Sequence, residues 1–164
     1  MPTFIALIRG INVGGNKKLS MADLKSVCES LGYTNVRTLL NSGNVVFDAK
    51  RAKAADIEKA LPIEARVILR TPAELKKAID RNPLEGEPNK VMIMFLDGEP
   101  KTGLDWDGPE EARVDGRHVY LYYPNGSGTT NLTNTFIERK LGVAGTTRNL
   151  NTVTKLLALT HPKG

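Results

Sequence analysis

Six short segments in the first 70 residues constrain the fold more than any other feature of this sequence. Their apolar spacing and the turn residues that bound them are typical of four strands and two helices. In order, the sequence predicts a strand over 3–9, a helix beginning after Ser20 and ending at Gly32, strands over 36–40 and 44–47 joined by Asn41-Ser42-Gly43, a helix over about 51–61, and a strand over 66–70. This order is the split βαβ, or ferredoxin-like, pattern.

The second half of the chain follows a similar plan. A helix opening at the capping box Thr71-Pro72-Ala73-Glu74 and a charged, Pro-rich linker precede it. The sequence then predicts a buried strand over 91–96, a short helix around Trp106, a hairpin turning at Asp115-Gly116, a helix ending at Gly142, an extended piece, and a last helix over about 149–159. We therefore expect an α+β fold of two ferredoxin-like halves, residues 1–82 and 83–164, consistent with a duplication.

Composition narrows the class of protein. The chain is 40% hydrophobic, and no apolar run approaches the roughly 20 residues that span a membrane. The N-terminus lacks the pattern of a signal peptide, and the single cysteine, Cys28, excludes an intrachain disulfide. Cys28 has the helical spacing of a core residue, and His118 and His161 are isolated in the sequence. We expect a cytoplasmic protein with no metal and no cofactor.

Charge is distributed unevenly between the two halves. Residues 1–82 hold 14 Lys/Arg and 8 Asp/Glu, a net charge of +6, whereas residues 83–164 hold 9 and 10, a net charge of −1. The first half is therefore the one expected to meet an acidic partner. Lys50, Arg51 and Lys53 flank a predicted helix and are interpreted as a solvated surface.

The segment IRGINVGGNKK, residues 8–18, combines glycines with cationic side chains. It joins a strand to a helix N-terminus, where backbone N–H groups and the positive helix end favour an anion. The candidate anion-binding residues here are Arg9, Asn12, Gly14, Gly15 and Lys17. The spacing is neither that of the GxxxxGK[ST] phosphate loop nor that of GxGxxG. The alternative is a long turn whose lysines are solvated.

Two further segments add polar candidates. Because the first and third strands are neighbours in a split βαβ sheet, Asn41 and Asn44 of LNSGNVVF are expected near Arg9, although hairpin turn chemistry alone explains this segment. In TTRNLNT, either Thr147 or Asn149 is expected to cap the last helix.

Arg148 is also a candidate, because a cation at a helix start is unfavourable unless an anion lies beside it. A fourth segment, PNGSGTT, has no basic side chain and ranks lowest as an anion site.

Three stretches resemble a known bacterial family, domain of unknown function 1697. They are RGINVGGNKKLSMADL, LNSGNVVF and ERKLGVAGTTRNLNTVTKL, and the resemblance covers essentially the whole chain. It implies a duplicated ferredoxin-like α+β protein of about this length and no known activity. Leu150 stands where the family often has a tryptophan, and Thr129-Thr130-Asn131 stand where basic residues often follow the Gly-rich loop. If those basic residues bind an anion in relatives, that part of the site is weaker here.

The function that these patterns favour is binding of a phosphate-bearing small molecule, a nucleotide or a nucleic acid. Nucleic acid has less support, because an RNA-recognition motif would need stacking aromatics near Asn44 and Val46. One alternative is an acylphosphatase-like hydrolase, with Arg9 holding phosphate and Asn41 or Asn44 orienting water. Another is an interaction module whose glycine loops are structural. The patterns leave open the ligand, the oligomeric state and whether any reaction is catalysed.

Overall fold

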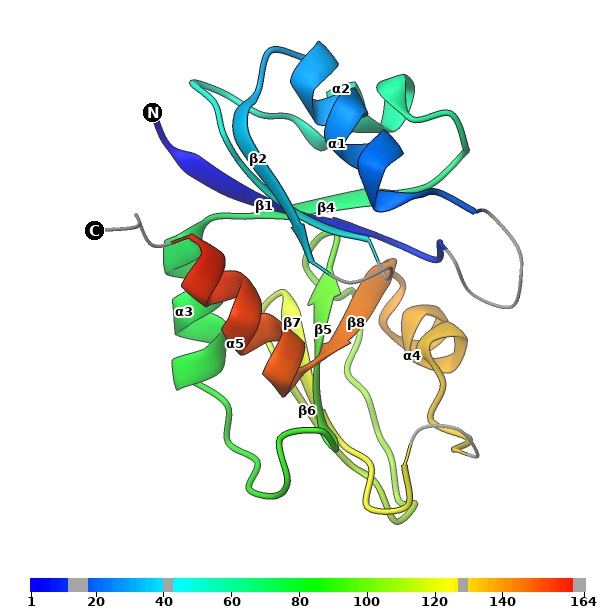
Figure 1. Ribbon diagram of the computed structural model, residues 1–164. Helices are drawn as coiled ribbons and strands as arrows, with labels where there is room; N and C mark the ends of the chain where they lie inside the picture. Colours follow the sequence, from blue (N-terminus) through cyan, green and yellow to red (C-terminus); the bar gives the residue numbers. More distant parts are fainter. Residues whose placement is uncertain (12–17, 40–42, 127–129, 161–164) are drawn as a thin grey trace. The chain divides into compact units, whose positions relative to one another are not determined.

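The computed structural model describes residues 1–11, 18–39, 43–126 and 130–160 (Figure 1). These residues form a mixed α+β protein with two four-stranded antiparallel sheets and five helices. Contacts between Cα atoms divide the chain into unit 1, Met1–Lys76 with Lys155–Gly164, and unit 2, Lys77–Thr154. The predicted boundary after residue 82 stays a prediction. Within the described residues, no helix has the length and apolar character needed to cross a membrane.

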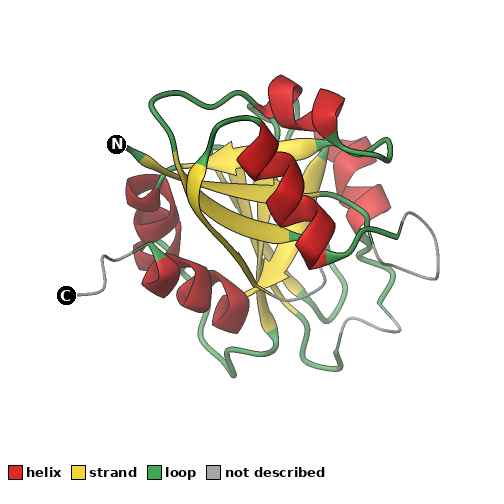
Figure 2. Ribbon diagram, turned by 45° about the horizontal axis from the view of Figure 1, so that its top comes forward, coloured by secondary structure: helices red, strands yellow, loops and turns green. Residues whose placement is uncertain are grey.

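Unit 1 contains the six elements predicted from the first 70 residues, in the predicted order. They are β1 (Thr3–Ile8), α1 (Met21–Ser30), β2 (Thr34–Leu39), β3 (Asn44–Asp48), α2 (Ala54–Ala60) and β4 (Val67–Arg70). The strands are arranged as β2-β3-β1-β4, so β1 and β3 are neighbours at the centre of the sheet. Both helices lie on one face of this sheet (Figures 1 and 2).

The core of unit 1 explains why these segments fold as they do. Ser20 caps α1 as predicted, because its side chain accepts a hydrogen bond from Asp23 N at 3.0 Å. The apolar face of α1 places Leu24 and Cys28 against strand residues of the sheet, among them Phe47. Cys28 is fully buried, so its prediction as a core residue is confirmed.

Unit 2 has the same kind of sheet but one helix fewer than predicted. Its elements are β5 (Val91–Leu96), β6 (Glu111–Asp115), β7 (His118–Tyr122), α4 (Asn134–Leu141) and β8 (Gly145–Asn149), with strand order β6-β7-β5-β8. Residues 97–110 are all described and none is helical, so the expected short helix around Trp106 is wrong. Two prolines and three glycines in these 14 residues disfavour a helix.

Two helices contain residues of both units. The first is α3 (Pro72–Asp80), and its capping box is confirmed, because Thr71 N donates to Glu74 Oε1 at 2.9 Å and Glu74 N donates to Thr71 Oγ1 at 3.2 Å. The second is α5 (Leu150–Leu159), which Asn149 caps by accepting a hydrogen bond from Thr152 N at 2.8 Å. This outcome selects Asn149 from the two caps that the sequence left open.

Three buried weak acids predict a loss of stability at alkaline pH. Burial raises the pKa of the Cys28 thiol from 9.0 to about 12, and those of the Tyr120 and Tyr123 phenols from 10.0 to about 12. Above about pH 9 the folded chain therefore binds more protons than the unfolded chain, and stability falls as pH rises toward 12.

Urea midpoints measured at successive pH values test this expectation. In Cys28→Ala the decline should begin about one pH unit later than in the wild type, because only the tyrosines then contribute. A midpoint that stays constant between about pH 9 and 11 would contradict it.

Candidate functional site

Two polar loops of unit 1 contact each other at one end of its sheet. Leu7 of β1 pairs with Asn44 of β3, and Ile8 N donates a hydrogen bond to Gly43 O at 2.8 Å. Gly43 has a φ of +90°, and a Cβ there would lie 2.8 Å from Ile11 Cδ1 and 2.9 Å from Ile8 Cβ. The chain leaving β1 therefore packs directly against the turn that enters β3, as the central position of these two strands predicts.

Cationic residues flank this contact. Arg9 is half-buried, and its backbone N–H donates to Arg66 O at 2.9 Å, immediately before β4. Arg66 and Lys18 are exposed. The end of the sheet where the two loops meet therefore carries two arginines whose backbones are directly hydrogen-bonded.

Asn44 has a structural role in this arrangement. Its side chain is fully buried, and Nδ2 donates to Leu39 O at 2.7 Å. Asn44 thus braces the hairpin between β2 and β3 from within. The other predicted residues of these loops, Asn12, Gly14, Gly15, Lys17 and Asn41, lie outside the described residues.

The N-terminus of α1 is partly satisfied by the chain itself. Ser20 accepts the Asp23 N–H, and the Asp23 carboxylate places a negative charge in the first turn. Both features compensate the positive end of the helix. The helix end therefore contributes less to anion binding than the sequence pattern suggested, and more of the proposed binding falls to the loop and its cationic side chains.

In unit 2, Arg148 lies in β8 opposite Ile93, and not in the first turn of α5. The argument from the helix dipole therefore does not apply to it. Its Nη1 donates to Thr146 Oγ1 at 2.6 Å and to Thr147 O at 3.0 Å. Only 8% of the residue is exposed, and this burial lowers the pKa of the guanidinium to about 10. Arg148 remains essentially fully charged at neutral pH.

Thr147 and Asn149 hold neighbouring helices in place. Thr147 Oγ1 donates to Asn134 Oδ1 at 2.7 Å at the start of α4, and Asn149 caps α5. These residues and Arg148 belong to unit 2, whereas Arg9 and the loop after β1 belong to unit 1. A single site that includes both groups stays a prediction.

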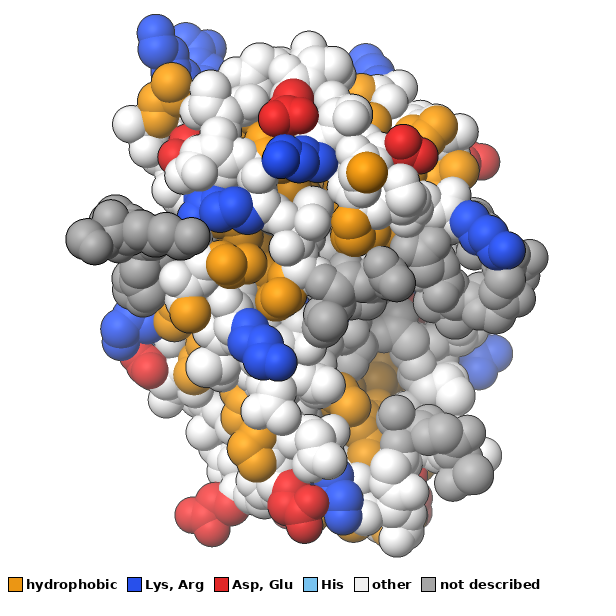
Figure 3. Space-filling model, viewed as in Figure 1, with side chains coloured by type: hydrophobic (Ala, Val, Ile, Leu, Met, Phe, Trp, Pro, Cys, Tyr) orange, Lys and Arg blue, Asp and Glu red, His pale blue; other side chains and the backbone are white. Residues whose placement is uncertain are grey.

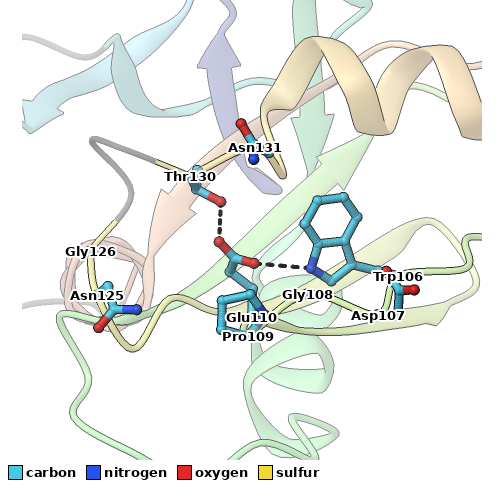
Figure 4. Close-up of a pocket in the computed structure, with 9 residues that line it drawn as sticks. All are labelled: Trp106, Asp107, Gly108, Pro109, Glu110, Asn125, Gly126, Thr130 and Asn131. Carbon is cyan, nitrogen blue, oxygen red and sulfur yellow. Dashed lines mark hydrogen bonds between the residues drawn. The ribbon is translucent and has the colours of Figure 1, made fainter.

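The sequence patterns missed a polar pocket in unit 2 (Figure 4). Its volume is ≈ 370 Å³, and it is lined by Trp106, Asp107, Gly108, Pro109, Glu110, Asn125, Gly126, Thr130 and Asn131. Glu110 lies between Trp106 and Thr130, with its Oε1 accepting from Trp106 Nε1 at 3.0 Å and its Oε2 from Thr130 Oγ1. The hydrogen bond from Thr130 is the main reason that the pKa of Glu110 lies below its usual value.

Metal chemistry has no evident centre in the part of the chain that the structure describes. No group of three or more His, Cys, Asp or Glu side chains there is arranged to hold a metal ion. On the face drawn in Figure 3, the Lys and Arg side chains of the described residues are scattered and do not gather into one patch. That face lacks the broad basic surface that typically follows a nucleic-acid backbone.

A comparison with known families identifies the relatives of this chain. The sequence profile of the family described as "Protein of unknown function (DUF1697)" matches residues 1–120. The chain belongs to this family. The match confirms the resemblance seen in the first two motifs and ends before the third, which begins at Glu138.

A solved structure supports the same fold. The conserved bacterial protein SP0830 from Streptococcus pneumoniae is similar over 98% of this chain and 99% of its own, with a TM-score of 0.72 and 19% sequence identity. At this identity the similarity establishes the fold alone. A comparison with curated proteins found no match.

Proposed function

We propose that this family member binds a phosphate-bearing ligand at the end of the unit 1 sheet where the loop after β1 meets the turn before β3. The observation that carries the proposal is the packing of Gly43 against Ile8 and Ile11, together with the hydrogen bond from Ile8 N to Gly43 O. Glycine- and asparagine-rich segments expose backbone N–H groups, which bind anions when several converge. Two such segments enter this end of the sheet.

Arg9 supplies the main charge in this proposal. A guanidinium binds phosphate through two parallel hydrogen bonds, and partial burial strengthens such bonds relative to those at an open surface. Lys17, Asn12, Gly14 and Gly15 would complete the cradle from the loop. A small molecule, a nucleotide or a nucleic acid could supply the phosphate, and the net charge of +6 on residues 1–82 favours each of them electrostatically.

We also propose that both units are variants of one ferredoxin-like plan. The common strand order, with the first and third strands of each unit paired at the centre, supports it. In this interpretation unit 2 replaced its first helix with residues 97–110. Loss of that helix would leave the loop free to form the pocket at Trp106.

Replacing Arg9 with alanine should weaken anion binding about 10- to 100-fold, because a hydrogen bond to a charged group contributes roughly 1.5–3 kcal/mol. The measurement is the thermal shift produced by pyrophosphate, nucleotides, sugar phosphates and short RNA, at two salt concentrations. Arg51→Ala is the matched control, since Arg51 is exposed before α2 and its loss changes the net charge equally. The wild type and this control should give the same shift.

Three results would count against the proposal. They are a melting temperature that no anion raises, binding by Arg9→Ala as tight as that of the wild type, and a loss of affinity in Arg51→Ala as large as that in Arg9→Ala. Phosphate release from acetyl phosphate, measured in the same samples, separates simple binding from the acylphosphatase-like alternative. Release that disappears in Arg9→Ala would favour the hydrolase.

A further inference from the structure

We propose that the pocket around Trp106 and Glu110 in unit 2 is a second binding site, and that it takes a small organic cation, such as a primary amine or a guanidinium compound. Its volume of ≈ 370 Å³ falls in the range of small-molecule sites. The proposal is independent of the anion site, because every residue that carries it belongs to unit 2.

The Glu110 carboxylate is held in place by donors on both of its oxygens. Trp106 Nε1 donates to Oε1 at 3.0 Å, and Thr130 Oγ1 donates to Oε2. The Thr130 hydroxyl also accepts from Leu132 N at 3.0 Å, which orients its proton toward Glu110. A carboxylate has about four lone-pair sites, so two fixed donors leave room for donors from a ligand.

The other polar groups of the pocket favour a ligand that donates hydrogen bonds and carries positive charge. Asp107 adds a second carboxylate, and Asn125 and Asn131 add amide groups. Among the described residues that line the pocket there is no Lys or Arg. Two carboxylates without a lysine or arginine among them attract a cation and repel a phosphate.

Trp106 forms a wall suited to a cation. Tryptophan is the best aromatic partner for an ammonium or guanidinium group. The indole is fixed by its bond to Glu110 and by an edge contact with Phe136, whose ring centroid lies 5.3 Å away. Gly108 packs closely against it, since a Cβ there would lie 2.7 Å from Trp106 Nε1. The aromatic wall and the carboxylate therefore hold a fixed relation to each other.

Trp106 is the only tryptophan of the chain, which makes the test direct. The full-length protein is titrated with cadaverine, agmatine and spermidine, and its single indole N–H resonance is followed by NMR. We expect a saturable shift with these cations and none with glucose or pyrophosphate. Glu110→Gln should weaken the binding about tenfold or more, because it removes the charge of the best-placed acceptor.

Glu111→Gln is the matched control, since Glu111 is exposed, adjacent in sequence and outside the pocket lining. It should bind as the wild type does. If Glu110→Gln fails to fold, Asp107→Asn at an exposed position serves in its place, with a loss of about threefold or more expected. No saturable shift up to about 10 mM cation would overturn the proposal. Equal binding of glucose, or unchanged binding in the folded pocket variant, would overturn it as well.

Discussion

Truncating Phe47 to alanine should lower the free energy of unfolding by about 3–5 kcal/mol, the largest effect that we expect from a single substitution in unit 1. Phe47 is fully buried in β3. Its ring stacks on Tyr33 with a centroid distance of 4.2 Å and an interplanar angle of 4°, and Phe4 lies 5.8 Å away on the same core. The truncation removes these contacts and leaves a cavity beneath α1 and α2.

Urea unfolding followed by far-UV circular dichroism measures this loss, because the single tryptophan reports on unit 2 and not on this core. Phe47→Leu is the matched control and should cost about 1–2 kcal/mol, since it keeps most of the buried volume. A loss below about 1.5 kcal/mol for Phe47→Ala would mean that the core tolerates the cavity and that the ring is packed less tightly than its contacts indicate.

Gly43→Ala should lower the free energy of unfolding by about 2–4 kcal/mol. The added methyl group would meet Ile11 Cδ1 at 2.8 Å and Ile8 Cβ at 2.9 Å, in a backbone conformation with φ of +90° that alanine rarely adopts. The second of these neighbours is attached directly to the backbone of β1. Relief of the clash therefore requires that the two loops move apart.

Gly10→Ala separates backbone strain from packing. Gly10 also has a positive φ, +70°, but nothing lies within 4 Å of the position that a Cβ would occupy. This variant should therefore cost only about 1–2 kcal/mol, the strain of the left-handed conformation. Equal losses in the two variants, measured by urea unfolding, would show that the loop after β1 does not pack against Gly43.

Local signals were sufficient to predict unit 1. Its helix start at Ser20, its turn at Gly43 and the stop before Pro62 each depend on residues within a few positions of one another. The capping box at Thr71 and Glu74 belongs to the same class of signal and was also confirmed. Such features can be recognised without knowledge of the tertiary fold.

The errors arose where a side chain takes a distant partner. The segment around Trp106 has a polar, helix-like appearance, yet its prolines and glycines give an irregular chain in which Trp106 bonds to Glu110. Arg148 was placed at a helix start, although β8 extends to Asn149 and includes it. In both cases the final structure depends on sheet pairing that a short window does not contain.

The pocket in unit 2 could not be found from the patterns used. Its walls come from residues 106–110 and 125–131, and the bond that joins them connects Thr130 to Glu110, 20 positions away. PNGSGTT ranked lowest because it lacks basic side chains, a criterion that detects only anion sites. A search for carboxylates beside a tryptophan would have drawn attention to Trp106 and Glu110.

Amide NMR of the unit 1 loops tests the central claim most directly. Pyrophosphate is titrated into ¹⁵N-labelled protein while the backbone N–H resonances of Arg9, Gly10 and Gly43 are followed, with Val119 of unit 2 as an internal reference. The account predicts saturable shifts at the three loop residues, little change at Val119, and loss of the response in Arg9→Ala. Loop resonances that do not move, or that move equally in Arg9→Ala, would contradict it.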